Sequence, residues 1–185
     1  MALTGTETLQ VLPTQANGSP AATTVLTTTQ DIANLSNDTD AVNTTIVRTS
    51  AAVTKNGSAA YANVTGLSYV VVPGTYDFEL ELPSTVASGT GGIKYAFNYT
   101  TAVLSALQAA ATGFTASAVD VQNTTSTTAQ ADLFTQAAVV ILTRIKGTMV
   151  VTTGGTIDVQ MAQNTSNGSN TVALIGGSAR FTRIA

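Results

Sequence analysis

Three acidic side chains at alternate positions are the residues best suited, in type and spacing, to acid–base chemistry. They are Asp77, Glu79 and Glu81, and the positions between them, within residues 76–82, are all apolar. Paired carboxylates can act as a general acid and a general base. An apolar–acidic alternation is also what a β-strand shows when one face meets the core and the other meets water. We interpret these carboxylates as a solvated stripe and expect no catalytic residues among them.

Two further segments invite a binding interpretation. Asp31, Asp38 and Asp40 could offer oxygen ligands to Ca²⁺, but the run that ends at Asp40 lacks the later glycine and bidentate glutamate of a calcium loop. The glycine-bearing residues 89–92 lack the lysine and the following helix of a phosphate loop. We therefore expect no metal site and no cofactor.

Histidine and cysteine are both absent from the 185 residues. Their absence excludes a Ser-His-Asp triad, imidazole and thiolate metal ligands, and disulfides. The sequence thus predicts a protein that is not an enzyme. Arg180 and Arg183 are expected to face opposite sides of one predicted strand and are interpreted as interface or surface charges.

Charge and hydropathy restrict the classes of partner that the chain can be expected to bind. Seven basic residues and an isoelectric point near 4.6 argue against nucleic-acid binding. No run of about 18 apolar residues predicts a membrane-spanning helix, and the N-terminus lacks the pattern of a secretory signal. Charged residues make up 9% of the chain, against about 25% in ordinary soluble domains. Such a surface suits a chain that buries its faces against copies of itself, so we expect an oligomer.

Residues 1–45 differ from the rest and predict an extended arm. Glu7 to Leu12 can form a short strand, and residues 29–35 a short helix capped by Thr29. This segment has too few large apolar residues to fold alone, so we expect it to become ordered against a partner. The apolar side chains expected to make that contact are Leu9, Val11, Leu12, Ile32 and Leu35.

Residues 46–185 predict an all-β domain. Nine or ten short strands are separated by turn signals every 8–15 residues, a pattern typical of a two-sheet sandwich and most simply of a jelly roll. Pro83 is expected to end the strand of residues 76–82, and residues 101–112 fit a strand or a helix, of which we favour the strand. Residues 123–130 read as a polar loop. Residues 139–151 and 155–163 are expected to pair across a glycine-bearing turn.

From about residue 67 the order of features resembles phage virion domains that share the jelly-roll fold of tumour necrosis factor and complement globular heads. The segments that carry the resemblance are Leu67 with 73–78 (PGTYDF), 92–97 (GIKYAF), 145–148 (IKGT), 155–164 (GTIDVQMAQN) and 177–184 (GSARFTRI). The leading residues 9–33 resemble the first segment of many phage structural proteins. Residues 46–66 carry little of the resemblance.

The resemblance implies a homotrimer that packs three jelly rolls about an axis, with the N-terminal arm attached to the major capsid protein or another virion protein. Residues expected on the axis are Tyr95, Phe97, Tyr99 and Phe181; the alternative is that all four are ordinary core residues. The implied location is the virion, assembled in the host cytoplasm.

Three functions follow, in decreasing order of preference. The first is a non-enzymatic head fibre or capsid decoration protein of a tailed phage. The second is a tail-fibre or receptor-binding module that recognises a host surface glycan through the loops at 84–92 and 123–130. Those loops hold no aromatic ring for sugar stacking, which disfavours this alternative. An enzyme acting on polysaccharide comes last, since His, Trp and an isolated acidic pair are lacking.

Overall fold

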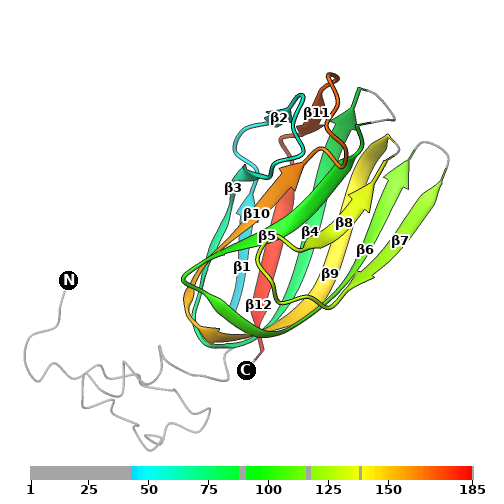
Figure 1. The fold of residues 1–185 in the computed structure, drawn as a ribbon. Helices are drawn as coiled ribbons and strands as arrows, with labels where there is room; N and C mark the ends of the chain where they lie inside the picture. Colours follow the sequence, from blue (N-terminus) through cyan, green and yellow to red (C-terminus); the bar gives the residue numbers. More distant parts are fainter. Residues whose placement is uncertain (1–42, 88–90, 116–117, 138, 185) are drawn as a thin grey trace, which may run out of the picture. The chain divides into compact units, whose positions relative to one another are not determined.

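A computed structural model describes residues 43–87, 91–115, 118–137 and 139–184 (Figure 1). The chain divides into a unit of residues 1–41 and a unit of residues 42–185, and all described strands belong to the second. The expected strand at Glu7 to Leu12 and the expected helix at residues 29–35 lie outside the described residues. The described part of the sandwich begins at Asn43, so its first strand takes in the last three residues of the expected arm.

The described residues form strands joined by turns and loops, and no helix among them is long and apolar enough to cross a membrane. The strands are β1 (Asn43–Arg48), β2 (Val53–Lys55), β3 (Ala62–Val71), β4 (Gly74–Val86), β5 (Ile93–Thr100), β6 (Val103–Thr115), β7 (Val119–Thr124), β8 (Asp132–Gln136), β9 (Val140–Thr153), β10 (Gly155–Ala162), β11 (Thr171–Ala173) and β12 (Ser178–Arg183).

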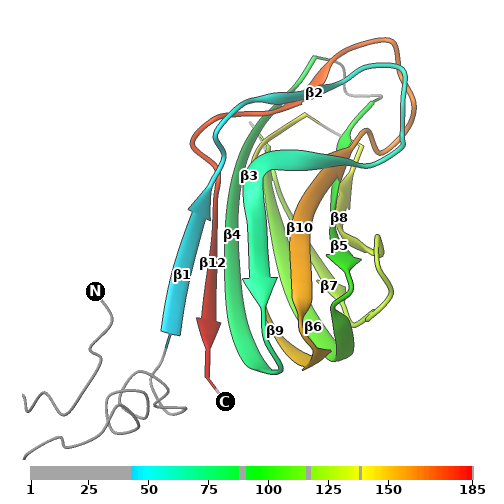
Figure 2. The same ribbon diagram turned by 90° about the vertical axis from the view of Figure 1, so that its left-hand side faces the viewer.

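Eight of these strands pair in a nested, wholly antiparallel order. In chain order the first pairs with the last (β1 with β12), the second with the seventh (β3 with β10), the third with the sixth (β4 with β9) and the fourth with the fifth (β5 with β8). Two sheets result, with cores of β1-β12-β4-β9 and β3-β10-β5-β8, and they face each other (Figure 2). This nested order is that of a jelly roll, so the expected all-β sandwich is confirmed.

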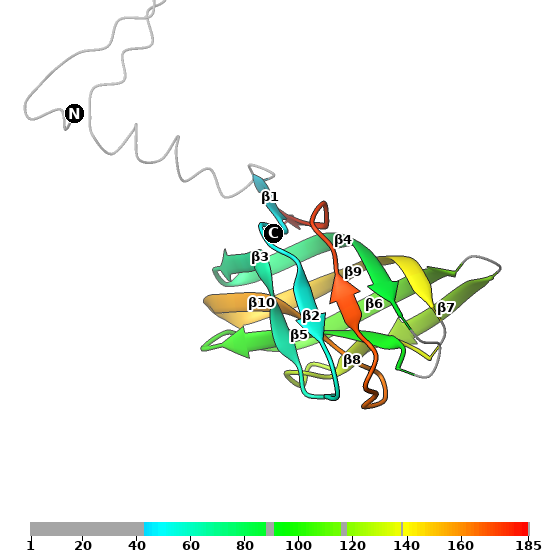
Figure 3. The same ribbon diagram turned by 90° about the horizontal axis from the view of Figure 1, so that it is seen from above.

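Four strands are additions to the jelly roll. The β6–β7 hairpin extends the first sheet beyond β9. The short strands β2 and β11 pair with each other, and β11 also pairs with the end of β4 (Figure 3).

The expected pairing of residues 139–151 with 155–163 is wrong. Strand β9 pairs with β4 and β6, whereas β10 lies in the other sheet between β3 and β5. The chain crosses between the sheets at Gly154, and a Cβ at Gly155 would lie 2.3 Å from Ala102 N and 2.4 Å from Thr100 O. The glycine at 155 therefore serves a close approach of backbones rather than a hairpin turn.

Pro83 does not end β4, contrary to expectation. The strand continues to Val86, with Pro83 opposite Leu142 of β9. On its other side β12 pairs with β4 only up to Glu81, and β11 begins at Ser84. In a strand the N–H and C=O of one residue point to the same neighbour, so the proline nitrogen lies where the two partners meet and no ladder donor is needed. The Pro83 carbonyl still accepts a hydrogen bond from Leu174 N, at 2.9 Å.

Residues 101–112 belong to a strand, as expected, and the reason for their helix-like spacing is visible. The register of β6 against β9 shifts between Leu104 and Ala106, which leaves Ser105 as an extra residue. A bulge of this kind breaks the period of two, so Leu104 and Leu107 both reach the core at a spacing of three. The adjoining strand β7 takes in Asn123 and Thr124, which were expected to lie in a loop.

The core lies between the two sheets and is aromatic at its centre. Tyr69 of β3 stacks on Phe181 of β12, with ring centroids 4.6 Å apart, and Phe78 of β4 meets Phe97 of β5 edge to face at 5.1 Å. Each pair joins one sheet to the other. Aromatic pairs in these geometries contribute about 0.5–1.5 kcal/mol beyond the burial of their area.

One buried amide holds the loops that follow β2 and β10. Gln163 is fully buried, and its Oε1 accepts hydrogen bonds from Ser58 N and Asn167 N, each at 3.0 Å. Its Nε2 donates to Asn167 O at 2.9 Å and to Ser169 O at 2.6 Å. These four bonds use the whole donor and acceptor capacity of the side chain.

Candidate functional site

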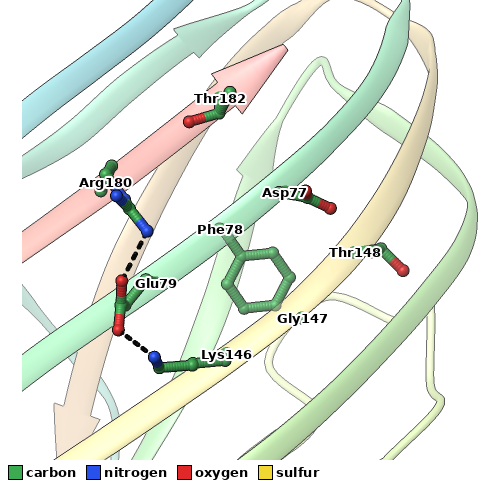
Figure 4. Close-up of a pocket in the computed structure, with 8 residues that line it drawn as sticks. All are labelled: Asp77, Phe78, Glu79, Lys146, Gly147, Thr148, Arg180 and Thr182. Atoms are coloured by element: carbon green, nitrogen blue, oxygen red, sulfur yellow. Dashed lines mark hydrogen bonds and ion pairs between the residues drawn. The ribbon is translucent and has the colours of Figure 1, made fainter. Parts of the chain in front are cut away.

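The outer face of the larger sheet carries a row of ion pairs across three neighbouring strands. Register places Arg180 of β12, Glu79 of β4 and Lys146 of β9 side by side. Arg180 Nη2 lies 2.7 Å from Glu79 Oε2, and Lys146 Nζ lies 2.5 Å from Glu79 Oε1 (Figure 4). In the next outward-facing row Arg144 Nε lies 2.9 Å from Glu81 Oε1. Both glutamates of the acidic stripe are thus neutralised.

This arrangement fixes the protonation state of Glu79. The hydrogen bond from Lys146 is the main cause that lowers the pKa of the Glu79 carboxyl, with smaller contributions from the neighbouring charges. A carboxyl with a lowered pKa is ionised near neutral pH and is a poor proton donor. The row therefore suits polar recognition or surface solvation better than acid catalysis. Because the cations are about half exposed or more, each pair contributes about 0–1 kcal/mol to stability.

Two shallow depressions lie on either side of Gly147. The first, of about 360 Å³, opens between β12, β4 and β9 and is lined by Asp77, Phe78, Glu79, Lys146, Gly147, Thr148, Arg180 and Thr182 (Figure 4). The second, of about 390 Å³, opens between β9, β6 and β7 and includes Gln108, Ala110 and Asn123. Their walls offer hydroxyl, amide, carboxylate and cationic groups, which can hydrogen-bond a polar ligand.

Gly147 sets the close packing beneath both depressions. A Cβ at this position would lie 2.1 Å from Gln108 O and 2.7 Å from Phe78 Cζ. The missing side chain lets the backbone of β6 and the ring of Phe78 come up against β9. The IKGT segment, in which this glycine stands, is therefore explained by packing.

The aromatic residues expected on a trimer axis lie in the core of one chain. Tyr95, Phe97 and Phe181 are at most 1% exposed, and Tyr99 is partly buried against the same core. Burial raises the pKa of Tyr95 and of Tyr99, so both remain neutral phenols. Buried side chains offer no surface to a neighbouring subunit. The alternative that these are core residues fits the structure, and a subunit interface would need other side chains.

The remaining expected site residues are placed as follows. The apolar residues of the arm, Leu9, Val11, Leu12, Ile32 and Leu35, lie outside the described residues, as do the aspartates 31, 38 and 40. In the parts of the chain that the structure describes, no three acidic side chains gather as metal ligands. Arg180 belongs to the ion-pair row, and Arg183 Nη2 donates to Pro73 O at 3.0 Å.

A polar network on the outer face of the smaller sheet was not predicted from the sequence. Gln160, 6% exposed, donates from Nε2 to Asn63 Oδ1 at 2.6 Å and accepts at Oε1 from Gln130 Nε2 at 2.9 Å. Tyr61 donates a hydrogen bond to Asp132, and Lys94 Nζ lies 4.6 Å from the centre of the Tyr61 ring. In the sequence, a buried glutamine cannot be told from a glutamine on the surface. The only available signal was that Gln160 stands between two core positions of a predicted strand.

Comparison with known proteins adds little to this picture. No family model matches the sequence, and no curated protein matches it. Among solved structures, the chain has a loose likeness to VP2 in the subviral particle of infectious bursal disease virus, with 10% identity, a TM-score of 0.19 and 95% of this chain covered. The chain spans 46% of the length of that protein. The strand order by itself places the described part of the chain among jelly-roll β-sandwiches.

Proposed function

We propose that this chain is a non-enzymatic structural protein of a tailed-phage virion, a homotrimeric head fibre or capsid decoration protein. Its N-terminal arm attaches it to the major capsid protein or to another virion protein. The observation that carries the proposal is the agreement between two features. The segments from residue 67 onward resemble phage virion domains of jelly-roll type, and the eight principal strands pair in the nested order of a jelly roll.

The chemistry of the described surface supports a role in assembly rather than in catalysis. Both glutamates of the acidic stripe are held in ion pairs, and the pKa of Glu79 is lowered rather than raised. Since function belongs to sites rather than to folds, this local chemistry and the sequence resemblance support the proposal more than the fold class does.

The attachment is tested by loss of incorporation into particles. Because β1 begins at Asn43, removal of residues 1–42 spares the first strand of the jelly roll. We expect purified particles to lack the shortened protein, while its circular dichroism keeps the β signal and its melting temperature is unchanged. Full-length protein with Leu9→Asp and Val11→Asp should show the same loss, whereas Val70→Asp, an exposed position on β3, should not. Normal incorporation of the shortened protein would contradict the proposed anchor.

A receptor-binding module that recognises a host glycan is the second candidate. The two depressions beside Gly147 favour it, because hydroxyl and amide groups such as those of Thr148, Gln108 and Asn123 line them. Against it, the only aromatic residue among those that line the two depressions is Phe78, which is 3% exposed. Binding of the full chain to purified host surface polysaccharide, lost on Thr148→Ala and kept on Val70→Thr, would favour this candidate over the first.

A further inference from the structure

Strand β7 has its polarity reversed. Val119 and Val121 point outward from the larger sheet and are 59% and 64% exposed. The alternate residues Asp120, Gln122 and Thr124 face inward and are half-buried. An edge strand of a free sandwich normally turns its apolar side chains to the core and its polar side chains to water.

The inward polar residues have a visible task. Gln122 Oε1 accepts from Thr135 N at 2.9 Å, and its amide nitrogen donates to Thr135 O. Thr124 Oγ1 donates to Asp132 O at 2.9 Å. These side chains satisfy backbone groups of β8, the edge strand of the other sheet, much as a further strand would. Asp120 accepts from Gln122 Nε2 at 2.6 Å. Contacts within one chain therefore explain the polar side chains on the inner face of β7. They do not explain why its two valines face outward.

The valines continue an apolar surface on β6, the strand beside them, and on β9, the next strand of the sheet. Register places Phe114 of β6 opposite both Val119 of β7 and Leu142 of β9. Phe114 faces outward, because the Arg144 guanidinium lies 5.6 Å from the centre of its ring. Phe114 and Leu142 are both half-buried. We call this surface the valine edge and define it as Phe114, Val119, Val121 and Leu142.

The charges around the valine edge are already matched. Arg144 is paired with Glu81 at 2.9 Å, and Asp120 faces inward to Gln122. A strongly charged partner would therefore find no free counter-charge among the described residues of this surface. The valine edge is instead complementary to another neutral, apolar surface, and a second copy of the chain provides one.

We propose that copies of this chain pack against one another through the valine edge. The inference rests on the self-association in the proposed function. It deepens that function, because it assigns the contact between copies to an exposed surface instead of to the buried aromatic residues that were expected on the trimer axis. Packing removes the two valines from water, and this burial drives the association.

The test compares two pairs of exposed valines in the full-length chain. Val119→Thr with Val121→Thr keeps side-chain shape and strand preference but removes apolar surface. Val70→Thr with Val72→Thr is the matched control, because these valines have the same spacing, are 70% and 51% exposed, and lie in β3 of the other sheet and just beyond its end. Molar mass is measured by light scattering across a concentration series, and melting temperature is measured in parallel.

We expect an oligomer for the unmodified chain and for the control, and a monomer, or a dissociation constant raised at least about tenfold, for the β7 pair. An unmodified chain that stays monomeric overturns the inference, and so does equal self-association of the two variants. Incorporation into particles is scored separately, so a monomer that still enters the virion would overturn the valine edge and leave the virion role standing.

Hydrogen exchange of the unmodified chain gives a readout that does not depend on any variant. The amides of residues 119–124 should become more protected as concentration rises. Protection that is independent of concentration would overturn the inference even if the threonine variants failed to fold.

Discussion

Replacing Gln163 by glutamate tests how far one buried amide holds the loops after β2 and β10. The substitution preserves shape and keeps an acceptor for Ser58 N and Asn167 N. It removes both donors, so the carbonyl oxygens of Asn167 and Ser169 lose their hydrogen bonds and meet a carboxylate oxygen instead.

The expected cost follows from those two carbonyls. A buried polar group that loses its partner costs about 1–3 kcal/mol, and both bonds are part-buried, so we take the lower half of that range for each. The free energy of unfolding should then fall by about 2–4 kcal/mol. For a domain of this size the melting temperature should fall by roughly 4–16 °C.

The assay is urea denaturation followed by circular dichroism at pH 7, with Gln108→Glu as the control because Gln108 is exposed on β6. Gln163→Leu, which leaves all four partners unsatisfied, should cost at least as much as the glutamate. Acid should reduce the deficit of Gln163→Glu relative to its control, because a protonated carboxyl regains one donor. Equal unfolding free energies for Gln163→Glu and Gln108→Glu would refute the reasoning.

Three further perturbations test the packing and the ion pairs. Gly147→Ala should lower the free energy of unfolding by at least about 3 kcal/mol, beyond the usual range for overpacking, because its Cβ would meet the backbone oxygen of Gln108 at 2.1 Å. The control in urea denaturation is Gly168→Ala, whose Cβ would have nothing within 4 Å. Phe97→Ala should lower stability by about 3–5 kcal/mol, equally at all protein concentrations if this ring is a core residue, as melting curves in a dilution series would reveal. Glu79→Gln should cost under about 1 kcal/mol at neutral pH. Because the folded pKa of Glu79 is lowered, its stabilisation is present above the unfolded value near 4.5 and is lost as pH falls, so the two proteins should melt more alike at pH 3 than at pH 7.

The strands with one face in the core were predictable from sequence, because burial imposes a period of two on their side chains. Residues 76–82 and 93–99 show this alternation, and both lie in strands. Pairing was not predictable in the same way. Residues 139–151 and 155–163 look like a hairpin locally, but each strand finds its neighbours in a different sheet. A turn signal reports only that the chain changes direction.

The candidate sites were less predictable, because apolar character does not distinguish a core from an interface. Phe97 and Val121 are both apolar, yet one is buried within the chain and the other is 64% exposed. Asn123 was predicted to lie in a loop rather than in β7, because the polar residues of this strand resemble those of a loop. Their role in covering the backbone of β8 depends on contacts between residues 8 and 13 positions apart.

The nested pairing also determines when each strand can find its partner during translation. Arg48 of β1 lies opposite Ser178 of β12, so the first strand of the roll waits for the last to leave the ribosome. At about 5–20 residues per second, that interval lasts roughly 6–26 seconds. During it the partner edge of β1 is uncovered, and a neighbouring nascent chain could occupy it. Slow translation or crowded polysomes should therefore favour swapped assemblies, and chaperone capture should be strongest before the final strand emerges.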